Sequence, residues 1–460
     1  MPYQSVNPYN GELLASFKRI TNKQLDMAIA SAQNCYEDWR ARTFANKTAV
    51  LLTAAAIMRN HADDYAQLIT LEMGKLIEQA RGEVLLSADI ITYYAEHAEA
   101  FLAPVNLSQK TGKAQLLSSP IGVLFGVQPW NFPFYQLARF VAPNLMAGNV
   151  VLVKHASNVP QCALAFEKLL HDAGAPKGAY TNLLIEYKQI DAIIGDPRIK
   201  GVALTGSEAA GRTVAASAGK NLKKTTMELG GSDAFIVLKD ADLDLAVQWA
   251  VWAKMNNAGQ SCVAAKRFIV HQSVADTFLN QFILALSAFK PGDPMNASTT
   301  LGPLSSEGAL QNLLKQVNLA VKHGATLLLG GKRADHAGAF MQPTILSNIS
   351  VDNPCYGQEL FGPVALFFIV SSEADAIQLA NDTEFGLGAS IFSQNISRAK
   401  RVANQIEAGM VFINQATWTA PDLPFGGIKN SGYGRELSSL GIQEFVNKKL
   451  VRVANSAMPV

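Results

Sequence analysis

Apolar residues recur at helical spacing over the first hundred positions of the chain. Between about residues 22 and 102 they return every three or four positions, as in LDMAIASAQNCYEDW and AVLLTAAAIMRNHADDYAQLITLEM. A period near 3.6 residues predicts several successive helices, each with one apolar face.

Short runs rich in β-branched residues follow and alternate with helical stretches. Strands separated by helices predict right-handed crossovers and a parallel sheet. The predicted strands are IGVLFGV (121–127), VVLVKHA (150–156), YTNLLIE (180–186) and GVALTG (201–206).

The same alternation resumes beyond residue 230, with AFIVL, RFIVH, VALFFIV, ASIFS and MVFIN as the strand candidates. We therefore predict an α/β fold with two parallel-sheet units, joined near residues 228–235. Two further strand-like segments, 114–121 and 448–455, have no partner helices. Such strands predict a small β extension that two copies of the chain can share.

Length and composition agree with a large globular protein. The 460 residues are too many for one hydrophobic core, and 49% hydrophobic against 17% charged residues leaves ample apolar surface to bury. A formal net charge of +2 gives no bulk reason to bind nucleic acid or an acidic membrane surface. The chain has no uninterrupted apolar run of about 18 residues, which a membrane span requires, and its start lacks a signal-peptide pattern. We expect a cytoplasmic location.

The four cysteines, Cys35, Cys162, Cys262 and Cys355, lie far apart, without a C-x-x-C pair or a histidine at metal-ligand spacing. This spacing argues against a disulfide framework or a structural zinc site, and no metal is expected. Reduced thiols in a cytosolic enzyme fit better.

One strand-to-helix junction offers a phosphate site. The strand GVALTG runs directly into SEAAGRTVAASAG, so Gly206 and Ser207 open a helix whose first N–H groups are free. An ordinary N-cap at Ser207 explains the same residues. The usual dinucleotide fingerprint G-x-G-x-x-G is absent.

Three further stretches carry candidate reactive groups. Pro129 and Pro133 bracket Asn131, and a rigid loop of this kind can aim the amide as an oxyanion-hole donor or simply form a turn. Glu228 lies among apolar residues before two glycines, which suits a general base with a raised pKa or a buried structural glutamate. Cys262, in NAGQSCVAAKRF, is either a nucleophile in an accessible site or a small buried apolar residue.

Together these stretches resemble the aldehyde dehydrogenase superfamily, and within it the bacterial NAD(P)-dependent succinate-semialdehyde dehydrogenases. The resemblance spans nearly the whole chain. It rests on PWNFP (129–133), MELGGSD (227–233), NAGQSC (257–262), QELFGP (358–363) and PFGGIKNSGYGRE (424–436), which occur in the family's order and spacing.

The resemblance implies three domains. Residues 1–108 and 122–230 would form a Rossmann-like cofactor-binding domain and residues 231–430 the catalytic domain. Residues 109–121 and 446–460 would be strands that build a homodimer or homotetramer.

The resemblance also implies the chemistry, oxidation of an aldehyde, most simply succinate semialdehyde to succinate. Cys262 would attack the aldehyde carbon to form a thiohemiacetal, whose oxyanion the Asn131 amide and the Cys262 N–H would hold. Loss of hydride to the nicotinamide would leave a thioester, and Glu228 would activate the water that hydrolyses it. Glu436 matches a second family carboxylate, a proton relay or a structural ion pair.

The cofactor, NADP or NAD, would lie over the helix start at Gly206 and Ser207. Where NAD-specific relatives have K-P-x-E, this chain has Lys154, His155, Ala156 and Ser157. Because a glutamate would repel a 2′-phosphate and a serine can donate to it, we expect NADP to be accepted. Further cofactor contacts implied are Trp130, Asn131, Leu229, Glu359 and Phe361.

For the substrate, the resemblance points to Arg139, which would pair with the carboxylate of the aldehyde, and to Phe425. An ion pair within the protein is the alternative for Arg139. Many relatives carry a second arginine six residues before the nucleophile, where this chain has Asn256. Another ω-semialdehyde or a small aliphatic aldehyde is therefore an alternative substrate. A thiol acyltransferase or amidase without nicotinamide, and a non-catalytic protein, are rival classes.

Overall fold

A six-stranded sheet organises the first half of the chain in the computed structural model, which describes residues 3–108 and 112–454. The strand order is β19-β9-β8-β5-β6-β7, and all pairs are parallel except β19 with β9. The strands are β5 (Val123–Gln128), β6 (Val150–His155), β7 (Tyr180–Asn182), β8 (Ile199–Thr205), β9 (Lys224–Glu228) and β19 (Gly432–Tyr433).

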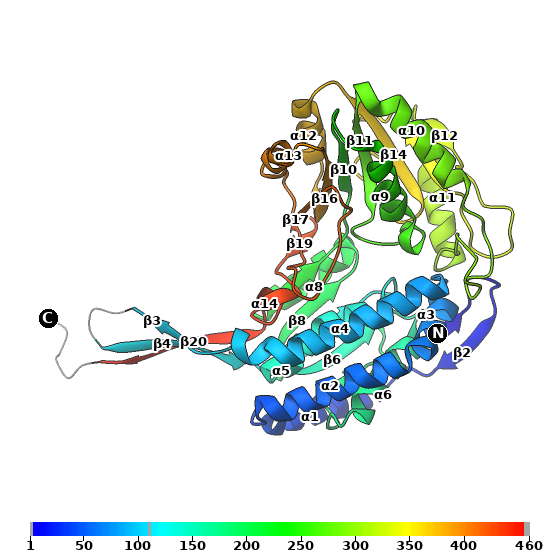
Figure 1. Cartoon of the computed structure of the whole chain (residues 1–460). Helices are drawn as coiled ribbons and strands as arrows, with labels where there is room; N and C mark the ends of the chain where they lie inside the picture. The colour runs from blue at the N-terminus through cyan, green and yellow to red at the C-terminus, as the bar shows by residue number, and fades with distance from the viewer. Residues whose placement is uncertain (1–2, 109–111, 455–460) are drawn as a thin grey trace.

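Helices pack against this sheet and share its apolar core, as the lower body of Figure 1 shows. The predicted helical region is confirmed as four successive helices. They are α1 (Asn22–Trp39), α2 (Phe44–Asn60), α3 (Ala62–Met73) and α4 (Ile77–Phe101), and they are joined by α5 (Pro133–Ala147), α6 (Pro160–Asp172), α7 (Ile190–Gly195) and α8 (Glu208–Lys220). A short hairpin of β1 (Tyr3–Val6) and β2 (Leu13–Phe17) precedes them.

A seven-stranded sheet forms the second unit, in the order β12-β13-β14-β11-β10-β16-β17. Only the pair β12 and β13 is antiparallel among the described pairs of this sheet. Its strands are β10 (Asp233–Val237), β11 (Ala265–His271), β12 (Thr326–Leu329), β13 (Thr344–Ser347), β14 (Val364–Val370), β16 (Gly388–Phe392) and β17 (Met410–Ile413), and its helices are α9 (Leu243–Met255), α10 (Gln272–Ser287), α11 (Glu307–Lys322), α12 (Glu373–Asn381) and α13 (Ile396–Ala403).

The chain crosses between the sheets in the four residues between β9 and β10, inside the predicted interval. The predicted α/β class with two parallel-sheet units is confirmed. One strand is shorter than predicted: β7 ends at Asn182 rather than near residue 186. It is an edge strand with β6 as its neighbour in the sheet, and the chain enters a 3-10 turn at Tyr187.

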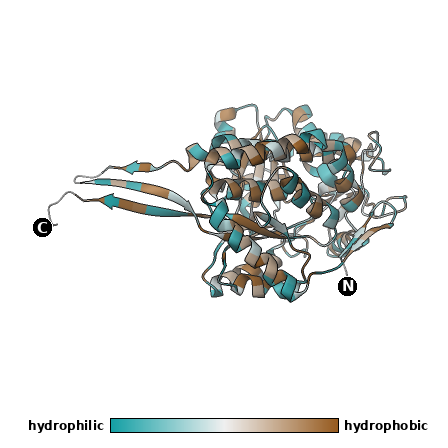
Figure 2. Ribbon diagram, turned by 90° about the horizontal axis from the view of Figure 1, so that it is seen from below, coloured by the Kyte–Doolittle hydropathy of each residue, from teal (hydrophilic) through white to brown (hydrophobic). Residues whose placement is uncertain are grey.

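The predicted β extension is a three-stranded sheet that projects from the body (Figure 2). β4 (Lys113–Pro120) pairs antiparallel with β20 (Val446–Val453) along its full length, and β3 (Val105–Leu107), which the sequence pattern did not indicate, adds to its other edge. Residues 109–111 and 455–460, which fall within the predicted extension, lie outside the described residues. The remaining short elements are β15 (Phe385–Gly386), β18 (Ile428–Lys429) and α14 (Ser438–Gly441).

Two buried glutamates fix the helices that start at the sheet edge. Both α5 and α6 begin with a proline and lack a capping side chain of their own. Glu83 of α4 accepts hydrogen bonds from the N–H groups of Phe134 (2.9 Å) and Tyr135 (3.2 Å) at the start of α5. Glu72 of α3 does the same at the start of α6. A carboxylate satisfies N–H groups that have no partner inside the helix and is favoured by the helix dipole.

Replacing Glu72 with alanine should therefore destabilise the protein. The substitution leaves the buried N–H groups of Gln161 and Cys162 without acceptors, at a cost of about 2 to 3 kcal/mol. The measurement is the urea midpoint of unfolding. Glu99→Ala removes an exposed glutamate of α4 and should change the free energy of unfolding by less than about 0.5 kcal/mol. Equal effects of the two substitutions would show that the buried cap is unimportant.

Candidate active site

A cavity of about 260 Å³ lies at the carboxyl ends of three neighbouring parallel strands, β5, β8 and β9. In open parallel sheets this edge is where ligands bind. Loops of the second unit close the cavity from the other side. Predicted site residues that line it are Trp130, Asn131, Gly206, Ser207, Glu228, Leu229, Cys262, Glu359 and Phe361. Pro129 and Gly230, which the sequence analysis noted for their backbone properties, also line it, as do Gln136 and Thr205, which it did not single out.

Cys262 precedes β11 and is half-buried, whereas the other three cysteines are buried, and all four are free thiols. Burial raises the pKa of the Cys262 thiol to about 12, and the nearby charges of Lys266 and Arg139 act to lower it. A thiol must lose its proton to become a strong nucleophile. The positive charges of Lys266 and Arg139 therefore favour the thiolate form of Cys262, against the effect of burial.

A left-handed turn delivers Cys262 to the cavity. Asn257, Ala258 and Gly259 have φ values of 53°, 52° and 75°. The left-handed region costs an alanine energy that surrounding contacts must offset. Gln79 accepts the Asn257 N–H at 2.9 Å, and the Gln260 side chain accepts the Ser305 N–H at 2.8 Å. These contacts from two separate elements hold the turn.

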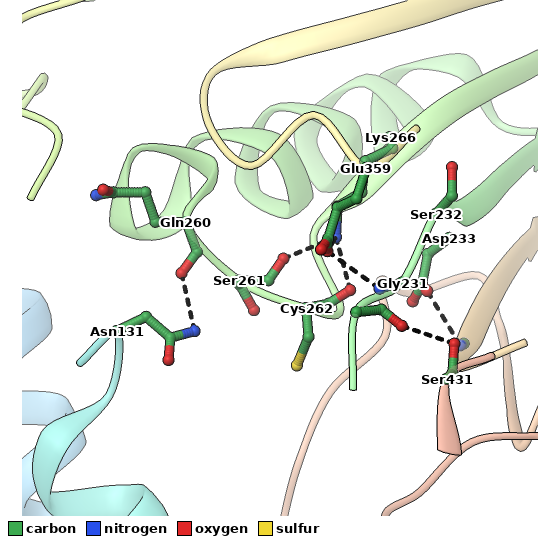
Figure 3. A network of polar contacts seen from close by, with 12 residues as sticks. Asn131, Gly231, Ser232, Asp233, Gln260, Ser261, Cys262, Lys266, Glu359 and Ser431 are labelled. Atoms are coloured by element: carbon green, nitrogen blue, oxygen red, sulfur yellow. Dashed lines mark hydrogen bonds and ion pairs between the residues drawn. The ribbon is translucent and has the colours of Figure 1, made fainter. Parts of the chain in front are cut away.

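The Asn131 loop is tied to the same turn. The Asn131 side-chain amide donates to the Gln260 carbonyl at 3.2 Å, which leaves its second N–H for another acceptor. The main-chain carbonyl of Asn131 accepts hydrogen bonds from the Lys75 ammonium and from the Asn257 side-chain amide, each at 2.9 Å. Figure 3 shows Asn131 facing Gln260 next to Cys262. The rigid loop predicted from its two prolines is thus also held by side chains distant in sequence.

Glu228, the last residue of β9, is buried, and neither carboxyl oxygen has a hydrogen-bond partner. Burial raises the pKa of Glu228 well above its usual range, against the lowering effect of Arg139. The carboxyl group therefore keeps its proton to a higher pH than an ordinary glutamate does. A carboxyl group with a raised pKa and free oxygens suits proton transfer to and from a bound reactant.

Glu359 and the Cys262 side chain lie on opposite sides of the loop at residues 257–264 (Figure 3). This segment is named the nucleophile loop, after the role predicted for Cys262. The Glu359 carboxylate accepts the Gly231 N–H at 3.1 Å and pairs with Lys266 at 3.1 Å. The adjoining Gly230 is needed for space, because a Cβ atom there would lie 2.6 Å from Glu359 and 2.3 Å from Glu208. A Cβ atom on Gly231 would lie 2.6 Å from the Cys262 carbonyl. The two glycines let the crossing between the sheets touch the nucleophile loop.

Ser207 caps α8 as the strand-to-helix junction predicted. Its hydroxyl accepts the Ala210 N–H at 3.4 Å, and the start of the helix lines the cavity. At the opposite wall the rings of Trp130 and Phe361 meet edge to face with centroids 5.8 Å apart. The cavity thus runs from a helix N-terminus to the thiol, with an aromatic pair beside it.

The segment 154–157 lies apart from this cavity. Ser157 is exposed and lines a second cavity together with Arg19. Burial lowers the pKa of Lys154 to about 8, and its ammonium lies over the Tyr187 ring. The His155 ring is not free for a ligand: Nε2 bonds the Pro133 carbonyl, Nδ1 accepts the Ala156 N–H, and burial lowers its pKa to about 4. His155 therefore joins β6 to the start of α5, and neither ring nitrogen is left to form a hydrogen bond with a cofactor.

Arg139, which is predicted to pair with the carboxylate of the aldehyde, is not among the described residues that line the cavity. It is buried on α5, and its Nε forms an ion pair with Glu436. Its other nitrogens donate to the Tyr135 hydroxyl at 3.2 Å and to the Thr205 hydroxyl at 3.4 Å. Because Thr205 lines the cavity, the guanidinium lies directly behind the cavity wall. The ion-pair alternatives considered for Arg139 and Glu436 are realised in one pair.

The remaining two predicted substrate residues have different surroundings. Phe425 is buried and its ring lies under the Arg139 guanidinium, 4.5 Å from centroid to Cζ. Asn256 directly follows α9, is half-buried and is not among the described residues that line the cavity.

A half-buried thiol, a buried carboxyl group without partners and a positioned amide meet at the carboxyl edge of a parallel sheet. This combination defines an α/β enzyme with a cysteine-centred site. Comparison with known proteins gives the family. Residues 1–451 match the model of the aldehyde dehydrogenase family, and the chain belongs to that family.

Similar proteins agree over the full length. The chain is 49% identical to the succinate-semialdehyde dehydrogenase [NADP(+)] of Deinococcus radiodurans, over 98% of this chain and 94% of that protein. It is 45% identical to succinate-semialdehyde dehydrogenase [NADP(+)] 1 of Mycobacterium tuberculosis, over 99% and 100%. The crystal structure of the Streptococcus pyogenes succinic semialdehyde dehydrogenase in complex with NADP+ superposes with a TM-score of 0.97 at 47% identity, covering 98% and 100%. The predicted family and fold are confirmed.

Two kinds of feature are absent from the described residues, a membrane-spanning helix and a metal-binding cluster. No helix within residues 3–108 and 112–454 is both long and apolar enough to pass through a bilayer. The same residues contain no group of three His, Cys, Asp or Glu side chains placed to hold a metal ion.

Glu228→Gln should make the protein more stable than the wild type under alkaline conditions. The folded protein holds a Glu228 proton that the unfolded chain releases, so wild-type stability falls as the pH rises from the unfolded pKa toward the higher folded pKa. The loss is at most about 1.4 kcal/mol per pH unit in that window. The variant has no titrating group at this position and escapes the loss.

The measurement is the free energy of unfolding of both proteins at about pH 5 and about pH 8. The advantage of the variant should be larger at the higher pH. Glu99→Gln, on the surface of α4, should show no such trend. An equal difference at both pH values would contradict a raised pKa for Glu228.

Proposed function

We propose that the protein oxidises succinate semialdehyde to succinate with NADP as hydride acceptor. The observation that carries the proposal is the full-length similarity, at 45% to 49% identity, to proteins named succinate-semialdehyde dehydrogenase [NADP(+)]. The cavity supports it, because Cys262, Glu228 and Asn131 meet there.

The walls of the cavity fit the nicotinamide half of a dinucleotide. The start of α8 offers free N–H groups for a pyrophosphate. Glu359 would accept hydrogen bonds from the ribose, and Trp130, Leu229 and Phe361 would surround the ring. When bound, NADP supplies an acceptor for the hydride that leaves the aldehyde carbon.

The residues of the chain would carry the other steps. The Cys262 sulfur, after losing its proton, bonds to the aldehyde carbon, and the free N–H of Asn131 together with the Cys262 N–H stabilises the resulting oxyanion. Loss of hydride leaves a thioester on Cys262. Glu228 then takes a proton from the water that attacks the thioester, and the acid and the free thiol are released. One aldehyde, one water and one NADP+ thus give one acid, one NADPH and one proton.

Arg139 is proposed to attract the carboxylate of the substrate from behind the cavity wall. A guanidinium has five N–H donors, and the contacts to Glu436, Tyr135 and Thr205 leave some of them unused. The positive charge lies next to Thr205, which lines the cavity. Contact with a substrate carboxylate requires a small opening of the wall at Thr205. An uncharged aliphatic aldehyde, the alternative substrate, would gain nothing from this charge.

A substrate panel tests the proposal. Wild-type protein should use succinate semialdehyde with a kcat/KM at least about tenfold above that of butyraldehyde, since a charge-assisted contact contributes about 1.5 to 3 kcal/mol. The matched variant is the double substitution Arg139→Gln with Glu436→Gln, which removes both charges of the buried pair and leaves neither one unpaired. It should lose this preference, and because Arg139 also favours the Cys262 thiolate, its rate on both aldehydes should fall by a similar factor. A wild type that uses both aldehydes equally would contradict the proposed substrate.

Ser157 is proposed to admit the 2′-phosphate of NADP. It is exposed at a cavity that Arg19 also lines, so a cation lies nearby. Ser157→Glu should raise the KM for NADP by about tenfold or more, because a carboxylate repels the phosphate, and should leave the KM for NAD nearly unchanged. Ser157→Ala is the control that removes the hydroxyl without adding charge. Equal effects of Ser157→Glu on both cofactors would exclude this position as the phosphate site.

We also propose that the chain forms a homodimer or homotetramer through the β extension. Apolar side chains of its strands are exposed, among them Leu450 (60%) and Val453 (64%), and among the described strands the outer ones, β3 and β20, each have β4 as their neighbour. The four free thiols support a reducing, cytoplasmic location.

A further inference from the structure

Lys266 is a buried lysine whose ammonium has three oxygen partners. Its Nζ donates to the Cys262 carbonyl at 2.6 Å and to the Ser261 carbonyl at 2.7 Å, and pairs with Glu359 at 3.1 Å. The side chain has no exposed surface. An ammonium has three N–H donors, so all of them are engaged. Figure 3 shows these contacts converging between Glu359 and the nucleophile loop.

Burying an ammonium is costly unless it is paired and hydrogen-bonded. The chain keeps one here, although a neutral donor could bond the same two carbonyls. What a neutral donor cannot supply is a positive charge between Glu359 and the main chain of Cys262. The position thus calls for an explanation in electrostatic terms.

We propose that Lys266 is a positioning residue for the reaction: its ammonium fixes the main chain of the nucleophile to Glu359 and holds a positive charge against the Cys262 carbonyl. The proposal rests on the proposed function, in which Cys262 is the nucleophile and Glu359 holds the cofactor ribose. One side chain would then join the cofactor-binding carboxylate to the reacting cysteine.

Charged groups around Cys262 come from several elements. Lys266 and Arg139 favour the thiolate, whereas Glu359 and Glu228 oppose it. Lys254 on α9 and Asp233 on β10 are also buried nearby and act on Lys266 or its partner Glu359. Removing Lys266 takes away one of the two cations and leaves Glu359 uncompensated. Both changes act in the same direction, against the thiolate.

Alkylation of Cys262 by iodoacetamide in the full-length protein, followed from about pH 6 to 10, reports thiolate formation directly. Lys266→Met should move the profile to higher pH and slow alkylation near pH 8 by about tenfold, whereas Lys266→Arg, which keeps the charge, should stay within about twofold of the wild type. Glu359→Gln should move the profile the opposite way, to lower pH. The control is Lys254→Met, which removes another fully buried lysine, one that donates to the Val364 carbonyl; it should leave the profile unchanged.

A folded Lys266→Met protein with the wild-type profile overturns the proposal. If that variant does not fold, Glu359→Gln decides the matter, since a profile that stays or moves to higher pH contradicts the electrostatic role. A shift with Lys254→Met equal to that with Lys266→Met would show a general loss of packing and also overturn it. The proposed function is tested separately by Cys262→Ser, because aldehyde oxidation that survives this substitution refutes the nucleophile whatever the alkylation profiles show.

Discussion

The approach of the crossing segment at Gly230 and Gly231 to the nucleophile loop is the contact on which the site depends. Here the main chain of one sheet unit comes so close to the other that no side chain fits between them. The Gly231 N–H is used by Glu359, and a Cβ at this residue would strike the Cys262 carbonyl. This contact fixes the position of residues in the first unit relative to residues in the second. With this contact in place, Glu228 at the end of β9 and Cys262 before β11 line the same cavity.

Most of the buried charged side chains described above have a partner of their own. Glu72 and Glu83 satisfy helix starts, Lys266 satisfies two carbonyls, and Arg139 is matched by Glu436. Glu228 differs from these, because its carboxyl oxygens have no partner. Glu72, Glu83 and Glu436 each have an N–H or cationic partner, so the exception at Glu228 agrees with the proton-transfer role proposed for it, at the expense of stability.

Much of the fold and part of the site could be predicted from sequence, for identifiable physical reasons. The change from helical spacing to alternating strands and helices depends on local periodicity, and it placed both sheets and their crossing. Asn131, Glu228 and Cys262 stand in short motifs with unusual residues, so their presence at one cavity could be expected. Lys266 lies four residues after Cys262, but its sequence neighbours do not indicate its role, because its partner Glu359 is distant in sequence. The Arg139 pair with Glu436 and the left-handed backbone at Ala258 likewise depend on contacts that no local pattern encodes.

The sheet order carries a consequence for how the chain is made. β19, near residue 432, completes the edge of a sheet whose other strands lie before residue 229, and β20 pairs with β4 across more than three hundred positions. On the ribosome the first unit therefore emerges with an open edge on β9 and with β4 paired to β3 alone, and neither open edge can close until the last thirty or so residues appear. Between those moments the nascent chain exposes strand edges that favour association, so chaperone dependence and sensitivity to C-terminal truncation are built into the topology.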